Sequence, residues 1–185
     1  MNHKQLSKLA LALGAMVMAG GAMAQQSATA AADTEAVVVK PITLTKETDL
    51  TFGRLASVAG DVFIAASNGA RTSDETGSLV AANGAAEAPG RATFTVAGEA
   101  GLTYAISGGT GPINLTSGAN TLVVTLTGVW VPSKTGAPGI AAVGTLPAEG
   151  GSETLGVGGT LTLADDTPSG TYANTAGISI TVNYN

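Results

Sequence analysis

The segment Gly170–Asn185, GTYANTAGISITVNYN, decides the predicted fold because its residues alternate in character with a period of two. The even positions become apolar toward the end, at Ile178, Ile180, Val182 and Tyr184, whereas the odd positions are small or polar. This period, with β-branched residues in the second half, is typical of a half-buried β-strand. We therefore predict one long strand over 170–185, which must lie in a sheet to satisfy its backbone groups.

Shorter segments with the same alternation recur along the chain between glycine-rich turns. Asn68-Gly69 predicts a hairpin after Gly60–Ala66, and Gly158-Gly159 predicts a bulge or kink in a later strand. Arg91–Ala97 and the segment from Leu102 to Ile106 predict a further hairpin. Many short strands joined by turns are typical of an antiparallel β-sandwich. The expected strands are about Glu35–Thr45, Asp49–Gly53, Gly60–Ala66, Ser78–Ala82, Arg91–Ala97, Leu102–Ile106, Ile113–Thr116, Asn120–Val131, Ala141–Leu146, Thr154–Leu163 and Gly170–Asn185.

The start of the chain predicts a secretory signal peptide. Lys4 and Lys8 precede a short apolar run, and Ala22-Met23-Ala24 has the small residues of a cleavage site. The run is shorter than the ~20 residues of a membrane-spanning helix, so we expect an exported chain that begins at Gln25 and has no membrane span. The predicted organisation is a signal peptide over residues 1–24, a flexible leader over 25–33 and a single β-sandwich domain over 34–185.

The composition removes most kinds of enzyme chemistry. The chain has no cysteine, and its single histidine, His3, lies in the predicted signal peptide. Catalytic triads, Cys-His nucleophiles and metal sites that need imidazole or thiolate are therefore excluded from the exported chain. That chain carries 6 basic and 13 acidic residues, a formal charge of −7, which disfavours nucleic acid and anionic membrane surfaces as partners. We predict no enzyme activity, no catalytic residue, no cofactor and no metal ion.

Acidic pairs and single aromatic residues remain as candidate sites. Asp74-Glu75 and Asp165-Asp166 lie in predicted loops, but a calcium site needs a longer series of oxygen ligands, so solvated turns are favoured. Trp130 and Tyr104 line a ligand pocket or fill the core. Large single aromatic residues in a strand-rich chain more often fill the core, which is the interpretation we favour.

Several motifs together give the chain a resemblance to a known family. They are Pro41-Ile42-Thr43 leading to Asp49-Leu50-Thr51-Phe52-Gly53, Phe94-Thr95-Val96-Ala97-Gly98 leading to Tyr104-Ala105-Ile106, Val157-Gly158-Gly159-Thr160-Leu161, and Gly170-Thr171-Tyr172 leading to Val182-Asn183-Tyr184-Asn185. Through them, nearly the whole exported chain resembles the bacterial family called domain of unknown function 4402. That name implies no particular activity.

The two ends of the chain also resemble, more loosely, pilin subunits of the chaperone-usher type. Such pilins resemble immunoglobulin-like sandwiches that lack one strand, which a chaperone lends first and the N-terminal extension of a neighbouring subunit later supplies. The resemblance implies that the strand ending near Tyr184 borders the receiving groove and that Glu35–Val39 is the donor. The implied strand-exchange residues are Val37, Val39, Ile42, Leu44, Ile178, Ile180, Val182 and Tyr184.

We therefore expect an all-β, immunoglobulin-like β-sandwich with Greek-key type antiparallel sheets, acting as a structural subunit of a fimbria-like surface assembly. Its expected partners are copies of itself or related subunits, with a periplasmic chaperone and an outer-membrane usher on the route through the periplasm to the cell surface. The alternative is a monomeric exported binding or adhesion domain. Both stay open because Glu35–Thr45 pairs either beside the terminal strand of its own chain or with a neighbour.

Overall fold

The computed structural model describes residues 28–134, 139–175 and 177–185. The predicted signal peptide, residues 1–24, lies outside the described residues. The chain divides into a compact unit, Val38–Asn185, and a separate unit that ends at Val37. In the separate unit, residues 28–37 are exposed and form neither helix nor strand.

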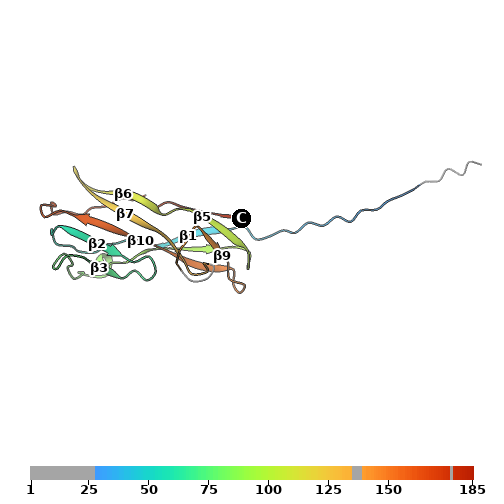
Figure 1. Ribbon diagram of the computed structural model, residues 1–185, viewed down its shortest axis with the longest axis horizontal. Coiled ribbons are helices and arrows are strands. Elements are labelled where there is room, and N and C mark those ends of the chain that lie inside the picture. The colour runs from blue at the N-terminus through green and yellow to red at the C-terminus, as the bar shows by residue number, and fades with distance from the viewer. Residues whose placement is uncertain (1–27, 135–138, 176) are drawn as a thin grey trace, which may run out of the picture. The chain divides into compact units, whose positions relative to one another are not determined.

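Strands account for nearly all regular structure of the compact unit (Figure 1). They are β1 (Thr43–Thr48), β2 (Gly60–Ile64), β3 (Arg71–Ser73), β4 (Ala92–Ala97), β5 (Thr103–Gly108), β6 (Thr110–Ser117), β7 (Asn120–Val131), β8 (Gly139–Ile140), β9 (Val143–Thr145), β10 (Ser152–Leu163) and β11 (Ile180–Tyr184), with one 3-10 turn, η1 (Ala85–Glu87). No helix among the described residues is long and apolar enough to cross a membrane.

The strands form two antiparallel sheets, which confirms the predicted all-β sandwich. The larger sheet has eight strands in the main order β1-β4-β10-β2-β3, and β7 pairs with β10, β6 and β8. The smaller sheet has three strands in the order β11-β5-β9. Several paired strands, such as β1 with β4 and β4 with β10, are not consecutive in the chain, so crossover connections of Greek-key type join them and the sheet is not a simple meander.

Strand β10 is the centre of the larger sheet. Its first half pairs with β4 and its second half with β2, while β7 lies along its other side. The register with β7 shifts between Val157 and Gly159, which confirms the bulge predicted at this glycine pair. A Cβ on Gly158 would overlap the Ile64 carbonyl oxygen, so the close approach of β2 requires glycine there.

The core lies between the sheets and follows the predicted alternation. Strand β4 buries Ala92, Phe94 and Val96 and leaves the residues between them half-buried. Tyr104 is fully buried, which confirms its predicted place in the core. Trp130 is only half-buried, with the Arg91 guanidinium 5.3 Å from its ring centroid. The prediction for the two aromatic residues is therefore confirmed for the tyrosine and only partly met by the tryptophan.

The predicted long terminal strand is wrong for most of its length. Only Ile180–Tyr184 forms strand β11, and the described residues of the preceding segment make one isolated bridge, between Thr116 and Ala173. A side-chain hydrogen bond holds this segment in place of a ladder, because Asn174 Nδ2 donates to the Asn114 carbonyl oxygen at 2.8 Å. The predicted alternation does hold at the end, where even residues are half-buried and odd ones exposed.

Other strand predictions also need correction. The first strand begins at Thr43 and not at Glu35, because Pro41 has no N–H for a ladder. The segments predicted as a second hairpin, β4 and β5, lie in different sheets and do not pair. The pieces expected near residues 49–53 and 78–82 form only isolated bridges. The hairpin predicted at Asn68-Gly69 is confirmed by the antiparallel pairing of β2 with β3.

Candidate functional site

Strand β11 pairs with β5 on one side only. At the two ends of this ladder, Gly109 N donates to Ser179 O at 3.0 Å and Asn185 N donates to Thr103 O at 3.3 Å. Because hydrogen-bonded pairs alternate in an antiparallel ladder, the odd residues of β11 direct their backbone groups to β5. The even residues direct theirs to the outer edge, which no ladder of the described residues uses. The residues whose backbone N–H and C=O groups face outward are Ile180, Val182 and Tyr184.

Strand β1 is the corresponding edge of the larger sheet, since it pairs with β4 alone. Gly98 N donates to Gly151 O at 2.9 Å, so even residues of β4 bond to β10 and odd ones to β1. Thr43 and Thr45 lie opposite those odd residues. The backbone groups of Ile42 and Leu44 consequently face outward.

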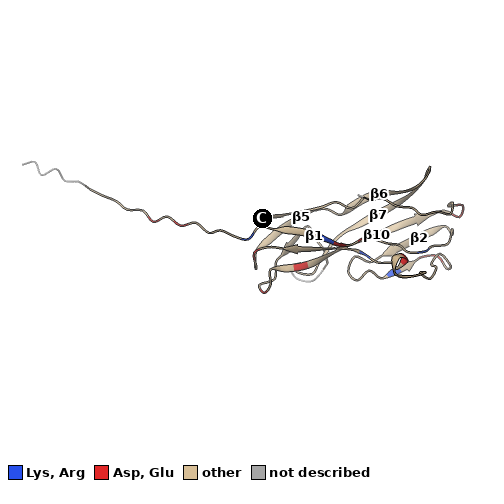
Figure 2. Cartoon of the chain, turned by 180° about the vertical axis from the view of Figure 1, so that it is seen from behind, with Lys and Arg blue, Asp and Glu red and all other residues tan. Residues whose placement is uncertain are grey.

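The edge of β11 lacks the devices that usually protect a free strand. Exposed edges normally carry charged residues, proline or a bulge that discourage the addition of another strand. Strand β11, ITVNY, has no charged residue and no proline, and its register with β5 is unbroken. Strand β1, by contrast, includes Lys46 and Glu47, and Figure 2 shows the charged residues of the chain by colour. Strand β11 is therefore chemically open to strand addition.

The predicted assembly residues that follow Pro41 gather along these two edges. Their side chains pack against the core while remaining only partly buried. A half-buried apolar row beside unpaired backbone groups is the surface that an added strand would cover. These residues are Ile42, Leu44, Ile178, Ile180, Val182 and Tyr184.

The predicted donor segment carries three consecutive exposed valines. The exposed fractions are 79% for Val37, 93% for Val38 and 42% for Val39. None of these residues belongs to a strand. In an extended chain Val37 and Val39 point to one face and Val38 to the other, so the segment offers an apolar pair with strand spacing.

Tyr184 connects the end of β11 to the residue before Pro41. Its hydroxyl accepts from Glu99 N at 2.6 Å and donates to Lys40 O at 2.8 Å. The Glu99 carboxylate in turn accepts from Lys40 N at 3.1 Å. We call this set, Lys40, Glu99 and Tyr184, the tyrosine clamp. Sequence alone predicted Tyr184 as a site residue but missed its two partners, which are ordinary surface residues without a distinctive pattern.

A second polar cluster lies in the core, between the sheets. The Tyr104 hydroxyl donates to Glu153 Oε1 at 2.5 Å, and Ser133 donates to the same carboxylate from its hydroxyl at 2.6 Å and from its N at 3.1 Å. Burial, together with the hydrogen bond to Glu153 and its negative charge, raises the pKa of Tyr104 far above its usual range. Every buried polar side-chain atom among the described residues has a partner, so the cluster is a closed structural network.

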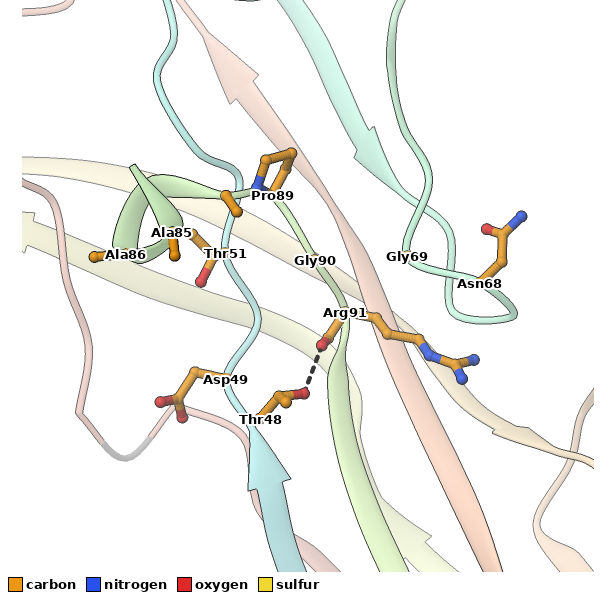
Figure 3. A pocket seen from close by; sticks show the side chains of 11 residues that line it. Thr48, Asp49, Thr51, Asn68, Gly69, Ala85, Ala86, Pro89, Gly90 and Arg91 are labelled. Carbon is orange, nitrogen blue, oxygen red and sulfur yellow. Dashed lines mark hydrogen bonds between the residues drawn. The ribbon is translucent and has the colours of Figure 1, made fainter. Parts of the chain in front are cut away.

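One cavity, of about 540 Å³, lies at the end of β1 (Figure 3). Its polar groups already have partners within the chain. The Asp49 carboxylate accepts from Lys46 Nζ at 2.8 Å, and the Arg91 guanidinium donates to the Ala66 and Ser67 carbonyl oxygens. The dashed line in Figure 3 is the hydrogen bond of 3.0 Å from Thr48 to the Arg91 carbonyl oxygen. This cavity gathers no pair of carboxylates for acid-base chemistry.

Another cavity, of about 450 Å³, lies between β7 and the loop after β10. Its lining combines the Tyr172 ring with Asn120, Asp166 and apolar groups of Leu122. Within the described ranges, no three His, Cys, Asp or Glu side chains are arranged to hold a metal ion. Asp74-Glu75 and Asp165-Asp166 are exposed, as solvated turns would be.

These features define a class, an antiparallel β-sandwich with one unprotected strand edge and an exposed apolar segment before its first strand. Comparison with protein families shows that residues 42–184 match the family described as Domain of unknown function (DUF4402). The chain belongs to this family, which confirms the resemblance carried by its motifs. No curated protein and no solved structure matches the chain.

Proposed function

We propose that the protein is a structural subunit of a fimbria-like surface assembly, in which a segment before β1 of one copy adds a strand to β11 of the next. The observation that carries this proposal is the unprotected outer edge of β11, with its outward backbone groups at Ile180, Val182 and Tyr184. The exposed run Val37–Val39 supplies a matching donor. In this proposal the open edge and the valine run are the two halves of a repeating head-to-tail contact, which builds an open fibre when the rotation between subunits does not close a ring.

The energetics favour this contact. An added strand satisfies outward N–H and C=O groups of β11 and buries alternate side chains. Full burial of an exposed valine side chain contributes about 1.5 kcal/mol or more. Because Val37 is 79% exposed and Val39 42% exposed, the pair contributes about 2 kcal/mol. Ordering the donor segment costs conformational entropy and opposes this gain. The backbone hydrogen bonds and the burial of the half-exposed apolar row on the receiving edges offset that cost.

The proposed route is export through the periplasm to the cell surface, with a chaperone and an usher as transient partners. The signal-peptide pattern of residues 1–24 supports export. An unprotected apolar edge also supports a chaperone, because such an edge promotes aggregation until it is filled. In this role the protein needs no catalytic group, cofactor or metal ion.

Opposite faces of the donor segment provide the test. In the full exported chain, a Val37→Asp/Val39→Asp variant should lower the association constant more than about thirtyfold, the equivalent of about 2 kcal/mol. Ala36→Asp/Val38→Asp is the matched control, because it places the same two negative charges on the other face and should have a much smaller effect. Sedimentation velocity measures the assembled fraction. Equal assembly of all three proteins would overturn strand donation.

A monomeric exported binding or adhesion domain is the second candidate. The cavity lined by Tyr172, Asn120 and Asp166, with ring, amide and carboxylate groups, is the observation that favours it. This function requires the wild-type chain to stay monomeric while it adheres to a surface, and requires Tyr172→Ala to reduce that adherence. Concentration-dependent assembly together with unchanged adherence of Tyr172→Ala would exclude it.

A further inference from the structure

The outer edge of β11 is complementary to the same edge of a second copy. Its outward backbone groups belong to alternate residues, Ile180, Val182 and Tyr184, and Val182 is the central one. Two such edges can meet antiparallel about a two-fold axis through Val182. Val182 of one copy then lies opposite Val182 of the other, and Ile180 of each copy lies opposite Tyr184 of the other. All three residues exchange backbone hydrogen bonds in this register, so no outward group of the strand is left unpaired.

The side chains of the smaller sheet suit this pairing. The two-fold axis places the half-buried apolar face of β11 on the same side in both copies, so Ile180 packs against Tyr184 across the junction. None of the three strands of this sheet, β5, β9 and β11, contains a charged residue. The chain as a whole has a formal charge of −5. Joining the smaller sheets therefore brings no like charges together at the junction, although the two copies repel each other elsewhere.

Strand β1, the corresponding edge of the larger sheet, lacks this complementarity. Its register with β4 shifts between Lys46 and Thr48, and its second half carries Lys46 and Glu47. Bulges and charged residues are the features that keep edge strands from pairing with each other. A second copy that approaches edge to edge is therefore directed to β11 and not to β1.

We propose that two copies of the chain pair through β11 in an antiparallel, two-fold dimer, which joins their smaller sheets into one continuous sheet. The dimer uses only groups of the compact unit and does not require the segment before Pro41. It occupies the same backbone groups as the proposed strand donation, so it caps the edge before assembly, and a donated strand has to displace the second copy. This capping role rests on the proposed function, whereas the dimer itself does not.

A single introduced thiol tests the dimer, because the chain has no cysteine of its own. The thiol of Val182→Cys lies at the two-fold axis, where the Cα atoms of a hydrogen-bonded antiparallel pair are about 5.5 Å apart, within the reach of a disulfide. Ile180→Cys is the matched control, because it lies on the same half-buried face of β11 but about 14 Å from its counterpart. After mild oxidation of the full exported chain, Val182→Cys should give at least about tenfold more covalent dimer on a non-reducing gel.

The exposed residues of β11 provide a second test that leaves its half-buried face unchanged. In the dimer Thr181 lies opposite Asn183 of the other copy, in the closer type of antiparallel pair. Thr181→Lys/Asn183→Lys places like charges opposite each other and should lower the dimer association constant by about tenfold. Thr181→Lys/Asn183→Asp places opposite charges there and should restore it. Sedimentation equilibrium measures both variants in a Val37→Asp/Val39→Asp chain, in which strand donation is weakened, and equal dimerisation of the two would overturn the antiparallel register.

The outcomes separate the dimer from strand donation. Absence of a disulfide dimer in Val182→Cys, or equal cross-linking of Ile180→Cys, overturns the dimer even where Val37→Asp/Val39→Asp still removes assembly. Cross-linked Val182→Cys together with assembly that Val37→Asp/Val39→Asp leaves unchanged supports the dimer and overturns strand donation. The capping role requires oxidised Val182→Cys to stop at the dimer and to assemble further only after reduction. Equal assembly of the oxidised and reduced forms would overturn that role.

Discussion

Tyr104 and Tyr184 lie directly opposite each other in the ladder between β5 and β11, but their hydroxyls meet different surroundings. Tyr104 is fully buried and donates to the carboxylate of Glu153, which belongs to the larger sheet. Tyr184 is half-buried, and its hydroxyl bonds to backbone groups of Lys40 and Glu99. One tyrosine joins the two sheets, and the other holds the chain at the edge of one sheet.

Under the proposed function, one short ladder serves both stability and assembly. The side of β5 away from β11 is covered by β9 and by the network around Glu153. The outer side of β11 has no such cover among the described residues. Because the core and the network around Tyr104 stabilise the domain, the outer edge of β11 can remain unpaired without unfolding it.

The largest loss in the free energy of unfolding is expected from Glu153→Ala. The substitution removes the common acceptor of the buried Tyr104 hydroxyl and the partly buried Ser133 donors, and an unsatisfied buried group costs about 1–3 kcal/mol. We expect a loss of about 3 kcal/mol or more in the free energy of unfolding, measured by urea denaturation of the monomer. Glu149→Ala, at an exposed loop position, is the control. A loss below about 1 kcal/mol would contradict the structural importance of the network.

High pH should reduce the contribution of Tyr104 to the free energy of unfolding. The pKa of Tyr104 is raised in the folded state, chiefly by burial and then by Glu153. An unfolded tyrosine ionises near pH 10, so this side chain contributes its full stability below that pH. The contribution falls as the pH rises above about 10, because the unfolded chain then releases a proton that the folded chain keeps.

Urea denaturation between pH 8 and 11 measures this dependence. Wild type and Tyr172→Phe should both lose stability steeply above pH 10, since both keep Tyr104. Tyr104→Phe should start from a lower stability and lose less of it over the same interval. Parallel pH profiles for all three proteins would show that Tyr104 ionisation is not coupled to unfolding.

The sequence predicted the sheets better than the pairings. Alternation identified the faces of β4, β7 and β10, because burial of one face is a local pattern with a period of two. It did not show that β4 and β5 enter different sheets, since partner choice depends on residues distant in the chain. It also extended β11 backward through Asn174, whose side chain bonds to Asn114 instead of allowing a ladder.

The candidate site was predicted only in part, because sequence shows local alternation but not contacts between distant residues. The apolar row of β1 and β11 has strand periodicity, so its residues were found from sequence. Glu153 also carried a usable signal, because it shares the inward face of β10 with Leu155 and Val157, where a charged residue needs buried partners. Lys40 and Glu99 carried none. Their role depends on the place where Tyr184 ends its strand.

The smallest effect on folding is expected at the edge, from Tyr184→Phe. Its hydroxyl bonds lie at half-buried and exposed groups, where water replaces lost partners, so the free energy of unfolding of the monomer should fall by about 1 kcal/mol or less. Tyr104→Phe, the same chemical change one strand away, should cost about 1.5–3 kcal/mol because its partner is a buried carboxylate. Urea denaturation of both variants at pH 7 measures the difference. If Tyr184→Phe costs as much as Tyr104→Phe, the edge tyrosine supports the fold itself, and the separation between a stabilising inner side and an assembling outer side is wrong.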